Sequence, residues 1–158
     1  MDKYIVPVQS DLYYLTMFGC RLFCVGNLFG ISEAEIIERR HELIENGSID
    51  TQYEILSIDR LIESFVPENH NKYRAYFITI DENEIINSNY INIPLVDEER
   101  GKVKGIFKKY ISTYNGEFKY HWVLQFPDKR EDYNTVTTCT ALKYGHIDTK
   151  SVMVIYEK

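Results

Sequence analysis

The chain is predicted to be an α+β protein in which helices come first and antiparallel strands follow. Helix start and stop signals gather in residues 1–70, whereas residues 73–158 carry short β-rich runs separated by turn residues. This order of elements is typical of α+β proteins, whose helices and antiparallel sheet are segregated along the chain. We expect one domain over residues 1–158, because this length suits one core and no linker or repeat interrupts it.

The first half contains the signals of three helices. One begins near Cys20, at the start of an apolar stretch. In the second, Ser32 and Glu35 have the spacing of a capping box, and Gly47 is a typical stop residue. Ser57 is positioned to cap a third, shorter helix, because a serine hydroxyl accepts a hydrogen bond from an unpaired N–H of the first turn.

The second half contains five β-rich runs. They cover residues 73–80, 102–114, 118–126, 134–144 and 151–156. Thirteen Tyr and eight Phe residues favour aromatic packing across a sheet. Asn115 and Gly116 lie between the second and third runs and predict a hairpin, since both residues tolerate the positive φ of a tight turn.

The charge of the chain argues against a nucleic-acid partner. The formal net charge is −6, whereas phosphate contacts need clustered Lys and Arg. The densest basic stretch contains Lys102, Lys104, Lys108 and Lys109. We interpret this stretch as the water-exposed edge of a strand, and the alternative is a contact patch.

No signal for export or for membrane insertion is visible. Residues 1–10 lack the basic start and apolar segment of a signal peptide, and no apolar run approaches the roughly 20 residues that span a bilayer. We therefore expect a cytoplasmic protein without a membrane partner. The three cysteines, an odd number, argue against a disulfide framework, and no Cys/His set has zinc spacing. Neither a metal nor another cofactor is expected.

Cys20 and His121 are the candidate reactive groups. A helix N-terminus carries unpaired N–H groups and partial positive charge, which favour the thiolate form of a cysteine in the first turn. A neighbouring histidine can take the thiol proton. His121 opens an apolar run, so we expect its imidazole at the rim of the core. The alternatives are that Cys20 is a small core residue and that His121 bonds a carbonyl group.

The other cysteines and histidines have plainer expectations. Cys24 lies one helical turn beyond Cys20, and we expect it in the core. Cys139 is expected to pack within a strand. The remaining three histidines are expected at the surface: His41, His70 and His146.

Several segments resemble the papain-like cysteine peptidases of the double-glycine, bacteriocin-processing type. The N-terminal likeness lies in residues 5–9, 18–20 and 29–32, and the later one in the His-Trp-Val of residues 121–123. Residues 18–20, the two-helix stretch and residues 45–50 more closely resemble domain-of-unknown-function family 261, found on bacterial plasmids and prophages. The resemblance implies a papain-like fold, with N-terminal helices packed on a C-terminal antiparallel sheet.

The resemblance also implies catalytic roles. Cys20 matches the nucleophile, and His121 matches the residue that acts first as general base and then as general acid. Gln9 matches the side-chain donor that, with the backbone N–H of Cys20, stabilises the oxyanion of acyl transfer. Such a donor contributes roughly 3–4 kcal/mol to the transition state.

The group that orients the histidine is where this chain departs from the family. Relatives carry an Asp or Asn on the strand after the histidine strand, but residues 134–140 contain no carboxylate. Thr138 could accept from the imidazole, and Asn134 could do so in a shifted register. Asp128 and Asp132 lie in the preceding loop and are expected to be solvated.

Three function classes remain open. The first is a cysteine hydrolase or transferase that acts on a peptide or isopeptide bond through an acyl-enzyme at Cys20. The second is a non-catalytic papain-fold binding protein of a mobile element, with an accessory or anti-defence role. The third is an α+β domain unrelated to papain. The expected partner is a peptide or protein, as substrate or as ligand.

Overall fold

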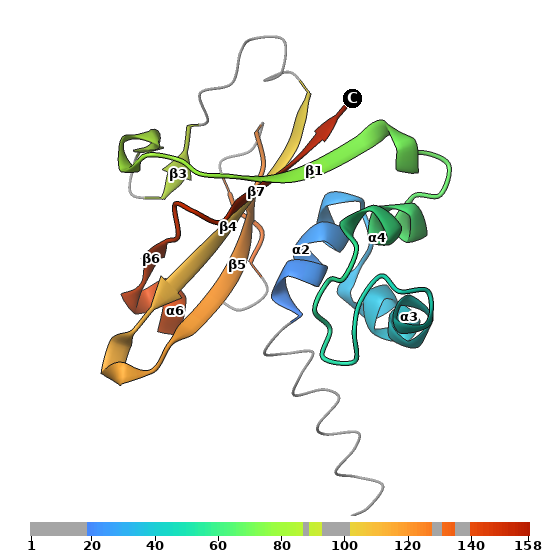
Figure 1. Ribbon diagram of the computed structural model, residues 1–158, viewed down its shortest axis with the longest axis horizontal. Coiled ribbons are helices and arrows are strands. Elements are labelled where there is room, and N and C mark those ends of the chain that lie inside the picture. The colour runs from blue at the N-terminus through green and yellow to red at the C-terminus, as the bar shows by residue number, and fades with distance from the viewer. Residues whose placement is uncertain (1–18, 87–88, 93–101, 128–130, 135–139) are drawn as a thin grey trace, which may run out of the picture. The chain divides into compact units, whose positions relative to one another are not determined.

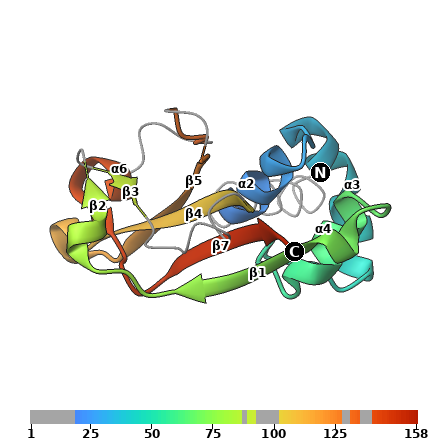
Figure 2. The ribbon, with the colours of Figure 1, turned by 90° about the horizontal axis from the view of Figure 1, so that it is seen from above.

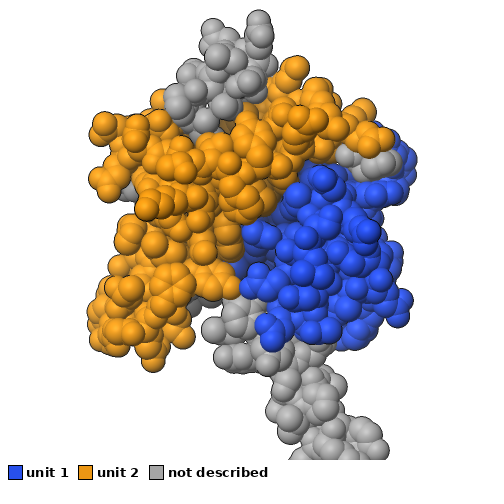
Figure 3. All heavy atoms as spheres, viewed as in Figure 1, with its two compact units in different colours: residues 1–70 blue, residues 71–158 orange. Residues whose placement is uncertain are grey.

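The chain is divided into two compact units, residues 1–70 and residues 71–158 (Figure 3). The computed structural model describes residues 19–86, 89–92, 102–127, 131–134 and 140–158. It combines helices with antiparallel strands, which confirms the predicted α+β class. The single papain-like domain stays a prediction, and each unit is described by itself.

Unit 1 is helical, and its helices begin and end where local sequence signals predict. Its helices are α2 (Cys20–Leu28), α3 (Glu33–Glu45) and α4 (Ile58–Phe65) (Figure 1). The Ser32 hydroxyl accepts a hydrogen bond of 3.2 Å from the Glu35 N–H, and the Ser57 hydroxyl accepts one of 3.2 Å from the Arg60 N–H. Gly47 follows α3 with a φ of 82°. The predicted caps and stop are therefore confirmed.

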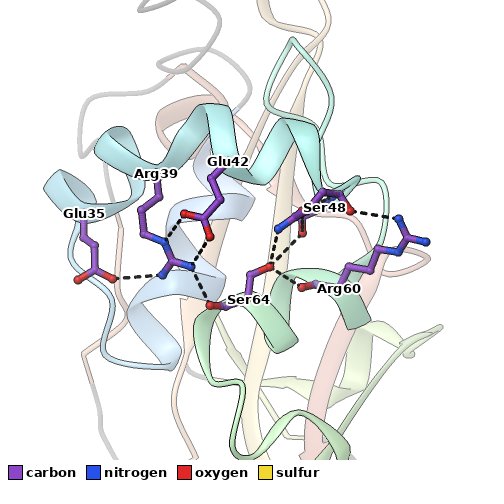
Figure 4. A network of polar contacts seen from close by, with 7 residues as sticks. Glu35, Arg39, Glu42, Ser48, Arg60 and Ser64 are labelled. Carbon is purple, nitrogen blue, oxygen red and sulfur yellow. Dashed lines mark hydrogen bonds and ion pairs between the residues drawn. The ribbon is translucent and has the colours of Figure 1, made fainter.

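A polar network joins α3 to α4 (Figure 4). The Arg39 guanidinium lies between Glu35 and Glu42 on its own helix, at 3.4 Å from each carboxylate. Its Nη2 also donates to the backbone carbonyl of Ser64 on α4, at 2.8 Å. Further hydrogen bonds around Ser64 involve Asn46, Ser48 and Arg60. Beneath the network, apolar side chains of both helices are buried: Ile36, Leu43, Leu61, Ile62 and Phe65.

Unit 2 is built on an antiparallel sheet. Its strands are β1 (Tyr73–Ile78), β4 (Val103–Ser112), β5 (Lys119–Gln125), β6 (His146–Ile147) and β7 (Val152–Glu157). Four of them lie side by side in the order β1-β7-β4-β5, and β6 also pairs with β4 (Figure 2). Two short strands, β2 (Ile85–Ile86) and β3 (Tyr90–Ile91), form a separate hairpin. The described residues also form the short 3₁₀ helices η1 (His70–Lys72), where unit 2 begins, η2 (Glu82–Glu84) and η3 (Tyr114–Gly116).

The predicted hairpin between β4 and β5 is confirmed. Its connection contains Asn115 with a φ of 58° and Gly116 with a φ of 75°. The two strands pair from Ile106 opposite Gln125 to Ser112 opposite Lys119. The turn residues therefore set the register that positions every side chain of β5.

The strand predicted over residues 134–144 is wrong at its C-terminal end, where residues 140–144 form the helix α6 (Thr140–Tyr144). Ala141 and Leu142 of this helix pack against the sheet core, and Ala, Leu and Lys all favour helix. At Gly145 a Cβ atom would lie 2.2 Å from the carbonyl oxygen of Ala141 and 2.3 Å from that of Ile111. Glycine thus lets the chain turn from α6 directly onto β4.

One face of the sheet carries an apolar cluster of buried residues. Residues directly opposite in an antiparallel pair share a face, and alternate residues of a strand share one as well. The buried members of the cluster are Ile80, Ile91, Ile106, Tyr110, Val123, Ala141, Ile147, Val152 and Val154. By the β4–β5 register, Lys108, His121 and Gln125 lie on this same face. Polar side chains therefore stand within a largely apolar layer.

Candidate functional site

His121 is a buried residue in the interior of β5. It lies opposite Tyr110 of β4, and only 5% of it is exposed to solvent. The expected rim position is therefore wrong, because β5 begins two residues earlier, at Lys119. A buried imidazole needs a polar partner.

The partner of His121 is Asn134. Nε2 of His121 lies 2.6 Å from Oδ1 of Asn134. The backbone brings Asn134 there: Leu124 and Tyr133 exchange two N–H···O=C bonds of 3.0 and 2.8 Å, so residues 131–134 lie along β5. Since Tyr133 shares a face with Leu124, its two neighbours in sequence fall on the face of His121.

This hydrogen bond indicates which tautomer the neutral imidazole adopts. An amide oxygen only accepts, so Nε2 of His121 carries the proton and Nδ1 of the neutral ring holds the lone pair. Burial lowers the pKa of His121 below its ordinary value, and the bond to Asn134 opposes that shift in pKa. The neutral ring is thus favoured at neutral pH, in the form that a general base requires.

A buried lysine, Lys108, lies on the same face of the sheet as His121. Nζ of Lys108 donates to Oδ2 of Asp132 at 2.5 Å and to the backbone carbonyl of Asn89 at 2.8 Å. Lys108 is 1% exposed and Asp132 is 28% exposed. Burial lowers the pKa of Lys108, although the hydrogen bond and charge of Asp132 oppose this.

Tyr110 neighbours both polar pairs, the His121–Asn134 pair and the Lys108–Asp132 pair. It shares the face with Lys108 on its own strand and stands opposite His121 on β5. Burial, and secondarily the negative charge of Asp132, raise the pKa of Tyr110 to about 12. The phenol therefore stays protonated near neutral pH.

The buried side chain of Gln125 lies on the same face, at the end of β5. Gln125 accepts from the N–H of Ile91 at 2.9 Å and donates to the carbonyl of Ile91 at 2.9 Å. The side chain thus replaces a strand partner and binds β3 to β5. Gln125 is fully buried, and both of its hydrogen-bonding groups are satisfied.

Cys20 is the first residue of α2, as the sequence predicts. Gly19 precedes it in the N-cap position and supplies no side-chain hydrogen bond to the helix. The first intrahelical bond runs from the N–H of Phe23 to the carbonyl of Gly19 at 2.9 Å. The N–H groups of the first helical turn point toward the N-terminal end of the helix, where they favour negative charge. Cys20 is 3% exposed.

Cys24 lies one turn further along α2 and is fully buried, which confirms its expected core position. Burial raises the pKa of Cys24 well above its ordinary value, and the nearby Cys20 and Glu33 raise the pKa further. Both cysteines are thiols rather than a disulfide. Cys24 is therefore a poor nucleophile at neutral pH.

The predicted catalytic residues are only partly described. Gln9 and Thr138 lie outside the described residues, as do Asp128 and Cys139. Cys20 belongs to unit 1 and His121 to unit 2, so their pairing stays a prediction. The bond from His121 goes to Asn134, the alternative considered for a shifted register.

The predictions for Lys108 and Asp132 are wrong. The sequence predicts Lys108 at a water-exposed strand edge and Asp132 in a solvated loop, yet the two form a largely buried ion pair. One signal for Lys108 was present in the sequence. It precedes Lys109, and consecutive strand residues face opposite sides, so one of two adjacent lysines on a two-sided sheet must face the core.

A separate pocket of about 280 Å³ lies at the end of the β4–β5 hairpin. It is lined by Ile111, Ser112, Thr113, Tyr114, Phe118, Tyr144 and His146. The rings of Tyr114 and Tyr144 stack at a centroid distance of 3.9 Å and an interplanar angle of 8°. Both rings are about half exposed, and Phe118 is 61% exposed. The pocket therefore presents aromatic surface to solvent.

No match to the chain was found among protein-family models, curated proteins or solved structures. The papain-like resemblance therefore rests on the sequence segments alone.

None of the helices in the described part of the chain is long and apolar enough to cross a membrane. Within the same residues, no group of three or more His, Cys, Asp or Glu side chains is arranged to hold a metal ion.

Proposed function

We propose that the protein is a cysteine hydrolase that cleaves a peptide or isopeptide bond through an acyl-enzyme at Cys20. His121 is the general base and then the general acid, and Asn134 orients it. The observation that carries this proposal is the bond of 2.6 Å between Nε2 of His121 and Oδ1 of Asn134. It supports the arrangement of papain-like proteases, in which a cysteine, a histidine and an asparagine act together.

The proposed reaction uses the lone pair on Nδ1 of His121 and the thiol of Cys20. Nδ1 of His121 takes the thiol proton, and the Cys20 thiolate adds to the substrate carbonyl carbon. The resulting oxyanion is stabilised by N–H groups at the start of α2, to which the resemblance adds the Gln9 amide. The imidazolium then gives its proton to the leaving amine as the C–N bond breaks. Water, deprotonated by His121, hydrolyses the thioester and releases the acid and the thiol.

The proposal requires two geometric conditions. Sγ of Cys20 must come within hydrogen-bonding distance of Nδ1 of His121, and the nearly buried thiol must be reachable by a substrate carbonyl. Alkylation by iodoacetamide tests both conditions without a known substrate, because the reagent reacts with the thiolate. The adduct at each cysteine is quantified by mass spectrometry of the native protein between mildly acidic and alkaline pH.

We expect Cys20 to be alkylated well below the ordinary thiol pKa of roughly 8.5. His121→Ala should slow this reaction at neutral pH by about 100-fold or more, the typical contribution of a positioned base. Cys24→Ala and His146→Ala, which change a buried thiol and an exposed histidine, serve as matched controls and should leave the rate unchanged. A rate at Cys20 that is insensitive to His121→Ala, or labelling only after unfolding, would contradict the proposal.

The aromatic pocket favours a second candidate, a non-catalytic binding protein. Exposed rings of Tyr114, Tyr144 and Phe118 suit an extended peptide that presents a proline or aromatic side chain. In this case Phe118→Ser and Tyr144→Ser should abolish binding to an array of such peptides, and Cys20→Ala should leave binding intact. Equal binding by all variants would exclude the pocket as the site.

A further inference from the structure

The segment that carries Asn134 is joined to the sheet by both backbone and side-chain hydrogen bonds. Its backbone makes the two hydrogen bonds between Leu124 and Tyr133. Its side chains contact the sheet from Asp132 to Lys108 and from Asn134 to His121. Asp132 and Asn134 are two residues apart, so they share a face and flank the backbone bridge on either side.

Lys108 is the central member of this arrangement. It lies on β4, which has neighbours on both sides in the sheet, and its ammonium group is buried beneath two separate segments. One N–H donates to Asp132 and another to the carbonyl of Asn89, in the turn between β2 and β3. The side chain thus holds both segments over the sheet face that carries His121.

The chemistry of Lys108 explains why this position is occupied by a charged group. A buried ammonium group is costly unless it is paired, so the ion pair forces Asp132 to stay at one place on the sheet. Charge-assisted hydrogen bonds are also stronger and shorter than neutral ones. Asp132 of the 131–134 segment pairs with Lys108, and Tyr110 of the same strand lies on the same face of the sheet. Neither an apolar residue nor a neutral amide would impose the same constraint.

We propose that Lys108 is a positioning residue that acts through Asp132 to keep Asn134 hydrogen-bonded to His121. The catalytic part of this proposal rests on the proposed hydrolase function, because the orientation of His121 serves a reaction only if the protein is a hydrolase. Its structural part stands independently, since the four residues and their bonds all lie within unit 2.

Protection of the Nε2 proton of His121 tests the structural part. In the full-length protein labelled with ¹⁵N-histidine, this proton should give a resonance that exchanges slowly with water. Lys108→Met and Asp132→Ala should each accelerate the exchange by roughly tenfold or more, the change expected when a hydrogen bond to a charged group is lost. Lys104→Met changes an exposed lysine of the same strand and should have no effect. Unchanged exchange in Lys108→Met and Asp132→Ala would overturn the proposal.

A double variant tests the positioning role in case the removal of a single charge unfolds the protein. Lys108→Met combined with Asp132→Asn removes both charges while keeping the side-chain shapes, and replacement of a whole buried pair is often tolerated. If this double variant folds, as its circular dichroism and methyl spectrum report, fast exchange at His121 supports the positioning role. Slow exchange in the folded double variant would contradict it.

The alkylation rate of Cys20 separates this proposal from the proposed function. If the hydrolase function and the positioning role both hold, Lys108→Met and Asn134→Ala should slow the alkylation of Cys20 by a similar factor. Lys108→Met combined with Asn134→Ala should then be little slower than either single variant, because the two residues act as one unit. If His121→Ala leaves the rate unchanged while Lys108→Met still accelerates proton exchange, the hydrolase proposal fails and the positioning role stands. Additive effects on the rate would overturn the catalytic part.

Discussion

The polar network on α3 and α4 and the polar cluster on the sheet use the same kinds of bond in opposite surroundings. In unit 1 the Arg39 side chain is 24% exposed, and its partners Glu35 and Glu42 are 46% and 60% exposed. In unit 2 Lys108 is 1% exposed and Asp132 is 28% exposed. Water screens the first set and competes for its bonds, whereas the second has little water to replace a lost partner. We therefore predict that removal of a charged partner lowers the free energy of unfolding more in the buried cluster of unit 2 than in the exposed network of unit 1.

The largest effect should follow removal of the partner of the buried lysine. Asp132→Ala leaves the ammonium group of Lys108 buried without its counter-charge, which typically lowers the free energy of unfolding by about 3 kcal/mol. Urea unfolding at neutral pH measures this loss. Because burial lowers the pKa of Lys108, the variant should recover stability as the pH rises and Lys108 loses its proton. Lys108→Met in the Asp132→Ala background should restore most of the lost stability. A loss below about 1 kcal/mol in Asp132→Ala alone would contradict the expected difference between buried and exposed bonds.

A smaller effect is expected at alkaline pH from Tyr110. Its pKa of about 12 exceeds the ordinary value of 10.0, so the folded protein keeps the phenolic proton more tightly than the unfolded chain does. The stability from Tyr110 is therefore complete below pH 10.0 and is lost as the pH rises through about 12. Tyr110→Phe cannot ionise and should unfold at a higher pH than the wild type, as followed by circular dichroism. Tyr114→Phe, at an exposed ring, is the control, and coincident unfolding curves for Tyr110→Phe and wild type would argue against a buried phenol.

A further pH effect should come from His121 and should be smaller than that of Tyr110. The pKa of His121 is lowered, so the folded protein binds the proton less readily than the unfolded chain. This contribution to stability is present above the ordinary pKa of about 6.5 and is lost as the pH falls through the lowered value. His121→Gln should therefore flatten the decline in unfolding free energy between about pH 7 and pH 5. The exposed His41→Gln serves as control, and an equally steep decline in His121→Gln would show that other groups cause it.

The smallest effect should come from the exposed network. Glu35→Gln removes one carboxylate from Arg39, which retains Glu42 and the carbonyl of Ser64. We expect a change of less than about 0.5 kcal/mol in the free energy of unfolding, and one that disappears at high salt. Glu38→Gln on the same helix controls for the loss of one negative charge. A change as large as that of Asp132→Ala would mean that exposure does not govern these bonds.

The two units also differ in how far their structure was predictable. In unit 1 the helix starts at Ser32 and Ser57 and the stop at Gly47 were predicted correctly, because a cap depends on residues three positions away. In unit 2 the Asn115-Gly116 hairpin was predicted for the same local reason. Residues 140–144 were not, since a short apolar run is compatible with strand or helix until its neighbours are known.

The residues of the candidate site were likewise predictable only where a local sequence pattern positions them. Cys20 at the start of α2 follows from local pattern, and Asn134 entered only as an alternative to Thr138. What selects Asn134 is the backbone bridge between Tyr133 and Leu124, because a one-residue shift would turn it to the opposite face. No pattern near Asn134 specifies that register.

By itself, the sequence determined the α+β class, the helix starts of unit 1 and the β4–β5 hairpin, since the caps and the turn depend on hydrogen bonds and φ preferences of residues close together in the chain. The tertiary structure alone decided that Lys108 is buried and that Asp132 is its partner, although the two are 24 positions apart. It also decided which side chain meets His121. These contacts depend on strand pairing and on the exclusion of water from one sheet face, and both arise only when distant segments assemble.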